Sequence, residues 1–380
     1  MKCKLEDIVD VTMGQSPKSE YYNTEGKGYP FLQGNRTFGF KYPTFDTYTT
    51  VMTKRANAGD VIMSVRAPVG DLNITPVDMC LGRGVCSLRM KNGNQNFLFY
   101  MMKYYISHLL KKESGTVFGS VNRNDINGLE VDIPEDAQVQ KKIARYLEMI
   151  DDKIELNNAI NNNLEQQMQA LYKSWFIDFK PFGNTMPCNW KTGKLKEVLK
   201  LKRQSLKAGD NTELPYLPID VIPMRTFALT GFKPNSEAQS SLITFDKDDI
   251  IIGAMRVYFH RVVLAPCDGI TRTTCFTLAP YNNEYLSFAL LCCDQERSID
   301  YAQSTSKGST MPYAIWEGGL GDMEIIIPTP EIAKKFNEIV LPMLRQIQNS
   351  YFENNRLREI RDLLLPKLMS GELDVSNIEI

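Results

Sequence analysis

The chain contains an internal repeat, in which the second half follows the first at an offset of about 190 residues. Residues 129–134 (LEVDIP) and 323–328 (MEIIIP) are both short alternating segments that end at proline, and a long helical pattern follows each. Three earlier motifs recur in the same order, in residues 4–8 and 194–198, 59–64 and 248–253, and 83–86 and 272–275. Repeats of this length are far longer than solenoid units, so the sequence predicts a pseudo-two-fold protein.

The repeat divides the chain into two globular segments and two helices. We expect a mixed α/β (α+β) fold, with pseudo-symmetric domains over residues 1–134 and 181–328 and long helices over residues 135–180 and 329–380. A chain of 380 residues is too long for one ordinary core, which agrees with two domains. The alternative is a gene duplication whose copies have no functional symmetry.

Both predicted helices follow a heptad pattern in which the apolar positions alternate at spacings of four and three. Such a pattern keeps one seam facing a partner helix, so we expect two long antiparallel coiled-coil helices. Each seam has a polar centre, which is Asn157 and Asn161 in one helix and Ser350 and Asn354 in the other. In an antiparallel pair these centres face each other and fix the register; otherwise they point to solvent. Pro342 is expected to kink the second helix or delay its start. The seam residues are Ile143, Leu147, Ile150, Ile154, Asn157, Asn161, Leu164, Met168 and Leu171, followed by Phe336, Val340, Ile347, Leu357, Leu364 and Leu368.

Composition excludes several classes of protein. The two histidines and the scattered cysteines have no metal-ligand spacing, so we expect no metal site. No apolar run reaches the ~18 residues of a membrane span, and residues 1–7 lack the apolar core of a secretory signal, so we expect a cytoplasmic protein. The net charge of −1 predicts weak DNA affinity for the chain alone and suggests a partner that supplies positive charge.

Several motifs resemble those of the specificity subunits of type I restriction–modification systems. Residues 363–373 (LLLPKLMSGEL) are similar to the closing motif of many such subunits, and residues 133–143 show the family's Ile-Pro followed by a Gln- and Lys-rich helix start. Residues 59–62 match its Gly-Asp-aliphatic strand, whereas the second copy has Asp248-Asp249 and loses the glycine. Residues 307–310 resemble its small-residue turn, and residues 114–116 are a looser match.

The resemblance covers essentially the whole chain and implies a function in DNA recognition. It implies two target recognition domains that read two half-sites of double-stranded DNA, and helices that serve as the docking surface for partners. Two modification subunits would carry out adenine N6-methylation with S-adenosylmethionine, and restriction subunits would use ATP and Mg²⁺ to translocate and cleave DNA. This chain would bind none of these cofactors.

The sequence itself argues against catalysis. There is no Gly-x-x-x-x-Gly-Lys-Ser/Thr phosphate loop, and no Asn/Asp-Pro-Pro-aromatic motif of an amino-methyltransferase. The acidic residues 246–249 could hold magnesium, but a solvated turn before a strand is the better interpretation. We therefore expect no enzyme. Two rivals remain open: a methyltransferase or nuclease with built-in recognition domains, and an interaction scaffold or silent specificity cassette.

Candidate DNA contacts follow from the chemistry of base edges and phosphates. Arginine reads guanine, asparagine and glutamine read adenine, and Lys, Ser and Thr bind phosphates. Arg83 lies between Gly82 and Gly84, where the backbone could approach a ligand closely, and with Arg272 it recurs in both copies, which suggests a shared phosphate-binding or structural role. A solvated or ion-paired surface arginine is the alternative throughout. The candidates are Gln33, Asn35, Arg36, Lys41, Arg66 and Arg83 in the first domain, and Arg225, Arg256, Tyr258, Arg272, Lys307, Ser309 and Thr310 in the second, with His260 nearby.

Overall fold

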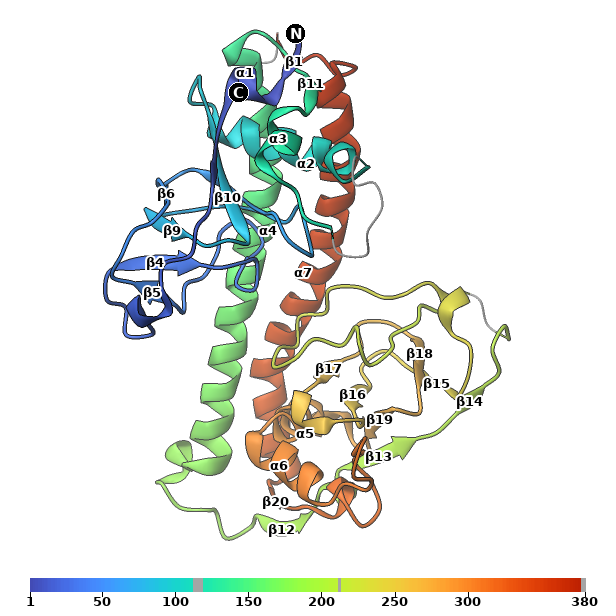
Figure 1. Ribbon diagram of the computed structural model, residues 1–380. Coiled ribbons are helices and arrows are strands. Elements are labelled where there is room, and N and C mark those ends of the chain that lie inside the picture. Colours follow the sequence, from blue (N-terminus) through green and yellow to red (C-terminus); the bar gives the residue numbers. More distant parts are fainter. Residues whose placement is uncertain (112–118, 211–212, 377–380) are drawn as a thin grey trace. The chain divides into compact units, whose positions relative to one another are not determined.

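The computed structural model describes residues 1–111, 119–210 and 213–376, and it divides into two compact units (Figure 1). Unit 1 comprises Met1–Glu155 and Leu357–Ile380, and unit 2 comprises Leu156–Arg356. Two long helices, α4 (Ala137–Tyr172) and α7 (Pro330–Ser370), contribute residues to both units. The predicted turn at residues 114–116 lies outside the described residues.

Unit 1 is built on a four-stranded antiparallel sheet. Its strand order is β2 (Val9–Met13), β10 (Val85–Met90), β7 (Val61–Ser64) and β8 (Leu72–Ile74), and the apolar helix α2 (Gln95–Lys111) packs against it. A second sheet has the order β3 (Tyr22–Asn23), β5 (Tyr48–Thr49), β4 (Tyr29–Leu32), β9 (Met79–Leu81) and β6 (Arg55–Ala56). The remaining elements are β1 (Lys2–Lys4), which pairs with β11 (Glu130–Asp132), and the short helices α1 (Leu5–Ile8) and α3 (Arg123–Asn127).

Unit 2 repeats this architecture. Its four-stranded sheet has the order β13 (Leu199–Lys202), β19 (Cys275–Pro280), β16 (Ile250–Gly253) and β17 (Val262–Leu264), which matches the order in unit 1 strand for strand. The other elements are β14 (Ser205–Leu206), β15 (Leu242–Phe245) and β18 (Gly269–Arg272) in one sheet, the pair β12 (Lys191–Lys194) and β20 (Glu324–Ile327), and the helices α5 (Leu286–Cys293) and α6 (Glu296–Ser304). The predicted mixed α/β fold with an internal repeat is confirmed.

The repeat extends to local hydrogen bonding. In unit 1 the backbone N–H of Lys4 donates to the carboxylate of Asp7 at 2.9 Å, and in unit 2 that of Lys194 donates to Glu197 at 2.8 Å. Each carboxylate, three residues into a short helical turn, satisfies a backbone donor that the turn leaves free. The Lys-Leu-x-Asp/Glu motif is therefore repeated because both units begin with the same capped turn.

In unit 2, the later part of α4 and the earlier part of α7 run antiparallel. Asn157 contacts Asn354, whereas Tyr172 contacts Phe336 with ring centroids 6.4 Å apart, so the sequence numbers rise in one helix as they fall in the other. The Asn157 side chain donates to Asn354 Oδ1 at 2.8 Å, and Asn354 donates to Asn158 Oδ1 at 3.1 Å. The prediction that the polar centres face each other is confirmed. All four predicted members of these centres are buried.

The other predicted seam residues are also inside or at the border of a core. Proline does not have the expected effect on the start of α7, because the helix begins at Pro330, well before Pro342, which is exposed. Among the described residues, no helix is both long and apolar enough to cross a membrane. Of the apolar seam residues, the buried ones are Ile143, Leu147, Ile154, Met168, Phe336, Val340, Ile347 and Leu368, and the half-buried ones are Ile150, Leu164, Leu171, Leu357 and Leu364.

Candidate nucleic-acid interface

The loop over residues 33–41 in unit 1 presents polar side chains beside a cavity of about 320 Å³. Gln33 and Arg36 line this cavity, and both are exposed. The Arg36 guanidinium donates to the two oxygens of Asp46 at 2.8 and 2.7 Å, and this interaction holds the pKa of Asp46 below its usual value. Asn35 donates to Asp71 at 2.5 Å. Arg36 can therefore reach a base or phosphate only by leaving Asp46, whereas Gln33 is free to do so.

Lys41 does not belong to this surface, and its assignment as a DNA contact was wrong. Its side chain is only 2% exposed, and its ammonium lies 3.1 Å from Glu148 Oε1 and 3.2 Å from Asp152 Oδ1, both on α4. Burial lowers the pKa of Lys41, but the bond to Glu148 and the nearby charges outweigh it and raise the pKa above its usual value. Lys41 thus holds the end of the loop against α4. Sequence reasoning could not distinguish this lysine from an exposed one.

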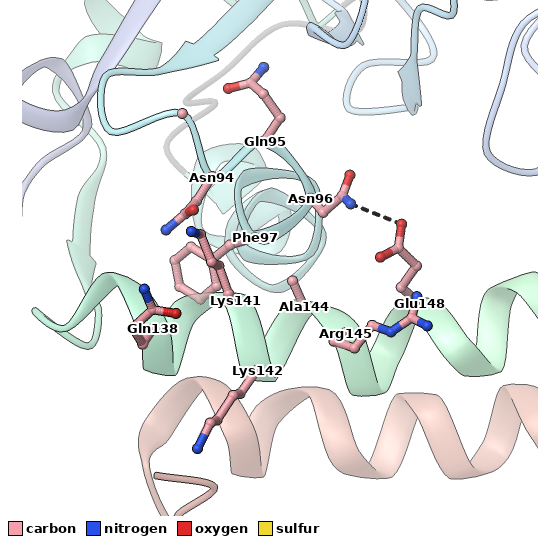
Figure 2. A pocket seen from close by; sticks show the side chains of 11 residues that line it. Asn94, Gln95, Asn96, Phe97, Gln138, Lys141, Lys142, Ala144, Arg145 and Glu148 are labelled. Atoms are coloured by element: carbon pink, nitrogen blue, oxygen red, sulfur yellow. Dashed lines mark hydrogen bonds between the residues drawn. The ribbon is translucent and has the colours of Figure 1, made fainter. Parts of the chain in front are cut away.

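Glu148 also borders a cavity of about 570 Å³ between the start of α2 and the face of α4 (Figure 2). Figure 2 shows the Asn96 side chain donating to Glu148, at 2.9 Å. Lys142 also lines this cavity, and its ammonium donates to the Ser376 carbonyl oxygen at 2.6 Å. Within the described part of the chain, Lys141 and Arg145 on its α4 wall form no ion pair, so the cavity is positively charged.

Arg83 is exposed at the turn before β10. Its flanking glycines were predicted to let the backbone approach a ligand, but the structure gives them a different role. A Cβ added at Gly82 would lie 2.6 Å from the Gln33 Cα, and one at Gly84 would lie 2.3 Å from the Gln33 carbonyl oxygen. The glycines therefore admit the backbone of the Gln33 loop, not a ligand. Arg66 is exposed beyond the end of β7, and its backbone bridges to Ser120.

In unit 2, three loop segments that carry most of the predicted contacts lie side by side. The Arg225 N–H donates to the His260 carbonyl oxygen at 2.8 Å, and the Arg256 N–H donates to that of Pro312 at 2.7 Å. Lys307 and Tyr313 exchange two backbone hydrogen bonds, each of 2.9 Å. The structure thus brings together the segments of Arg225, Arg256, Tyr258 and Lys307, with Ser309 and Thr310 exposed in the last one. Arg225 itself forms an ion pair with Glu296.

Arg272 is not part of this arrangement. It is exposed at the end of β18, and its guanidinium is 3.4 Å from the Ser240 hydroxyl. Its counterpart in the repeat, Arg83, makes no side-chain hydrogen bond or ion pair within the described residues. The two arginines therefore occupy corresponding positions of the repeat, before β10 and before β19, but they share no structural partner.

His260 anchors the loop that carries Tyr258. Its ring is buried, and Nε2 lies 2.8 Å from Asp294 Oδ1. Burial lowers the pKa of His260, but the hydrogen bond and charge of Asp294, with the charge of Glu296, raise it above its usual value. Arg256 and His260 both have left-handed backbone angles, with φ of 50° and 51°, which are strained for these residue types. The loop is thereby held in one fixed shape.

The acidic residues 246–249 have cationic partners. Asp246 and Asp249 bond Lys202, the latter at 2.6 Å, and Asp248 pairs with Arg345. Over the described ranges, no group of three or more His, Cys, Asp or Glu side chains is arranged to hold a metal ion. These carboxylates therefore serve to tie the turn before β16 to β13 and α7.

Comparison with known proteins finds similarity to one family. The family model described as "Type I restriction modification DNA specificity domain" matches residues 1–166. A Methanocaldococcus jannaschii protein named for the MjaX type I restriction enzyme specificity subunit is 37% identical over 168 residues, which is 44% of this chain and 39% of that relative. The MjaIX specificity subunit of the same organism is 26% identical, over 99% of this chain and 94% of its own length.

The chain is therefore similar to type I restriction–modification specificity subunits, through the family model over residues 1–166 and through relatives along its whole length. The crystal structure of such a subunit from M. genitalium has the same fold, with a TM-score of 0.65 at 19% identity over 97% of this chain and 95% of that one. The match to the MjaX relative spans only about two fifths of that protein's length.

Proposed function

We propose that this chain is a type I specificity subunit and that it reads a two-part DNA target, with one half-site contacted by the recognition domain of each unit. The observation that carries the proposal is the duplicated four-stranded sheet, with the same strand order in both units. Exposed polar loops border the sheet in each copy, but their residues differ, as at Gln33 to Arg36 in unit 1 and Arg256 to Tyr258 in unit 2. Different loops on the same framework fit two different half-site sequences.

The two long helices set the distance between the half-sites in this proposal. About 33 residues of α-helix span about 50 Å, which exceeds the ~34 Å of one turn of B-DNA. The hydrogen-bonded asparagines Asn157 and Asn354 support a fixed register for the helix pair, because a shift by one turn would leave these buried amides unpaired. We infer a gap of about six to eight base pairs between the half-sites.

Partner subunits supply the chemistry. We infer that two modification subunits carry S-adenosylmethionine and that restriction subunits carry ATP and Mg²⁺, while this chain binds no cofactor. Docking on the helices is supported by large apolar side chains that they expose in each unit. These are Met149, Ile360 and Leu363 in unit 1, and Leu156, Ile160 and Phe352 in unit 2. All eight cysteines are free thiols, which supports a cytoplasmic location.

Mapping of N6-methyladenine across the genome of the source cell, with and without this gene, tests the proposal. A bipartite methylated motif should vanish on deletion of the gene and return when it is restored on a plasmid. An unchanged methylome would contradict the proposal and favour a silent specificity cassette. Methylation by the purified chain alone would contradict the proposal that partner subunits supply the chemistry, and it would indicate a methyltransferase.

A further inference from the structure

The loop segments of unit 2 that lie side by side also carry five exposed large apolar side chains. They are Met224, Tyr258, Phe259, Met311 and Tyr313, with exposed fractions of 54%, 40%, 38%, 54% and 48%. We call these five residues the apolar tip. Apart from Tyr258, the sequence analysis missed them, because it searched for polar base-reading groups. Large apolar groups gathered on a surface normally mark an interaction site.

The chemistry around the apolar tip favours DNA as its partner. In the part of unit 2 that the structure describes, Arg256 and Lys307 are exposed and form no ion pair. Arg261 adds a third cation, with its guanidinium 5.7 Å from the centroid of the Phe259 ring. In a DNA complex the apolar centre could contact base edges while the surrounding cations contact phosphates.

The geometry of the two central rings decides how they could contact a base. The centroids of Tyr258 and Phe259 are 4.8 Å apart, and their planes are tilted by 53°. With this separation and tilt the two rings together do not match the ~3.4 Å spacing of stacked base pairs, which favours contact of the pair with base edges over insertion between bases. It can contact the edges of bases, where the one apolar group is the C5-methyl of thymine in the major groove.

We propose that the apolar tip recognises thymine, through contact of Tyr258 and Phe259 with the C5-methyl group in the half-site of unit 2. This inference rests on the proposed function and names the base that this surface reads. The fixed shape of the loop, with His260 bonded to Asp294 behind it, holds both rings in place before DNA arrives. A pre-formed contact loses less conformational entropy on binding.

The test uses the specificity subunit assembled with its modification subunits and DNA that carries the mapped target. Each thymine of the half-site in turn is replaced by deoxyuridine, which removes only the methyl group. Loss of one buried methyl should weaken binding about fourfold at one position or more. In Phe259→Ala, binding should be weaker and this sensitivity to deoxyuridine should disappear, while deoxyuridine in the other half-site has the same effect as before.

Tyr281→Ala provides the matched control, because Tyr281 is an aromatic residue of the same unit, 65% exposed, that lies just after β19 and outside the tip. It should keep the fourfold sensitivity. Thermal unfolding of each variant checks that the fold is intact. Equal binding of thymine and deoxyuridine by the unchanged protein would overturn the assignment while leaving the proposed function standing. Loss of assembly with partners in Phe259→Ala, with DNA sensitivity unchanged, would overturn it in favour of a protein interface.

Discussion

At the scale of residues, the carboxylate of Asp151 on α4 is the charged group that we expect to contribute most to the stability of unit 1, because its side chain has no solvent exposure. Arg361 Nη1 lies 2.9 Å from it, the Tyr100 hydroxyl donates to it at 3.0 Å, and Lys103 Nζ is 3.6 Å away. Burial and the charge of Asp151 raise the pKa of Tyr100, which keeps its proton on the hydroxyl. All four groups belong to unit 1, so this cluster fastens α2 and both long helices together there.

We predict that Asp151→Ala lowers the free energy of unfolding of unit 1 by about 3–5 kcal/mol, because it removes the carboxylate that Lys103 and Arg361 share and leaves Arg361 with only the exposed Asp362. Urea unfolding of the purified chain measures this. Asp152→Ala is the matched control on the next position of the same helix. Its side chain is half exposed and Lys41 keeps Glu148, so the expected loss is below about 1 kcal/mol. An equal loss of unfolding free energy in the two variants would mean that the buried cluster around Asp151 contributes no more to stability than an exposed ion pair does.

His260 should make the stability of unit 2 depend on pH. Its folded-state pKa is raised above the usual 6.5, so its ion pair with Asp294 stabilises the fold fully below about pH 6.5 and is lost as the pH rises through the folded value. Each pKa unit of the shift corresponds to about 1.4 kcal/mol. We therefore expect the melting temperature to fall between pH 6 and pH 9.

His260→Asn should flatten this fall, because asparagine is uncharged and tolerates the left-handed backbone at this position. The comparison is between the slopes of melting temperature against pH, measured by calorimetry, and not between the absolute values. The same slope in both proteins would show that another group causes the dependence.

At the scale of elements, the facing asparagines of α4 and α7 give a direct test of register. Asn157→Leu alone should cost about 1–3 kcal/mol, because it leaves the buried Asn354 Oδ1 without the donor that it accepts from. Asn157→Leu with Asn354→Leu should recover most of this loss, since two leucines pack across the seam. Asn162→Leu, at an exposed position of the same helix, should change stability little. A double variant less stable than the sum of the singles would contradict this account.

The long helices and the repeated sheet could be predicted because their signals are local or occur twice. The heptads predict α4 and α7, and the proline-ended segments predict β11 and β20. The second sheet of unit 1 could not be predicted in this way. Three of its strands, β3, β5 and β6, are two residues long, too short for any alternation to show. Pairing with distant strands determines them.

The candidate site was predicted only in part, because contacts between residues far apart in the sequence decide which side chains are exposed and unpaired. Arginines can be found in a sequence, but whether each is free depends on distant residues, such as Asp46 for Arg36 and Glu296 for Arg225. Lys41 was misassigned because α4, more than a hundred positions away, covers it. The apolar tip comes from loops that only the fold brings side by side.

At the scale of the whole molecule, the length of the helix pair should set the gap in the DNA target. Deleting residues 158–164 from α4 and the facing residues 347–353 from α7 shortens each helix by about 10 Å, or about three base pairs. We predict a methylated motif with the same two half-sites and a shorter gap, measured by methylome mapping. Replacing exposed residues of the same heptads by alanine keeps the length and should keep the gap. An unchanged gap after deletion would refute the spacer role.

The division of the chain between the two units has a consequence for its synthesis. Unit 2 is continuous, from Leu156 to Arg356, whereas unit 1 needs the last segment of the chain, whose Leu368, Met369 and Val375 are buried in its core. The ribosome therefore synthesises all of unit 2 before it supplies the residues that complete the core of unit 1, although residues 1–155 of unit 1 precede unit 2 in the chain. A nascent chain therefore exposes an incomplete unit 1 core until residues 357–376 have been synthesised, and termination before them would leave residues 1–155 without part of their core.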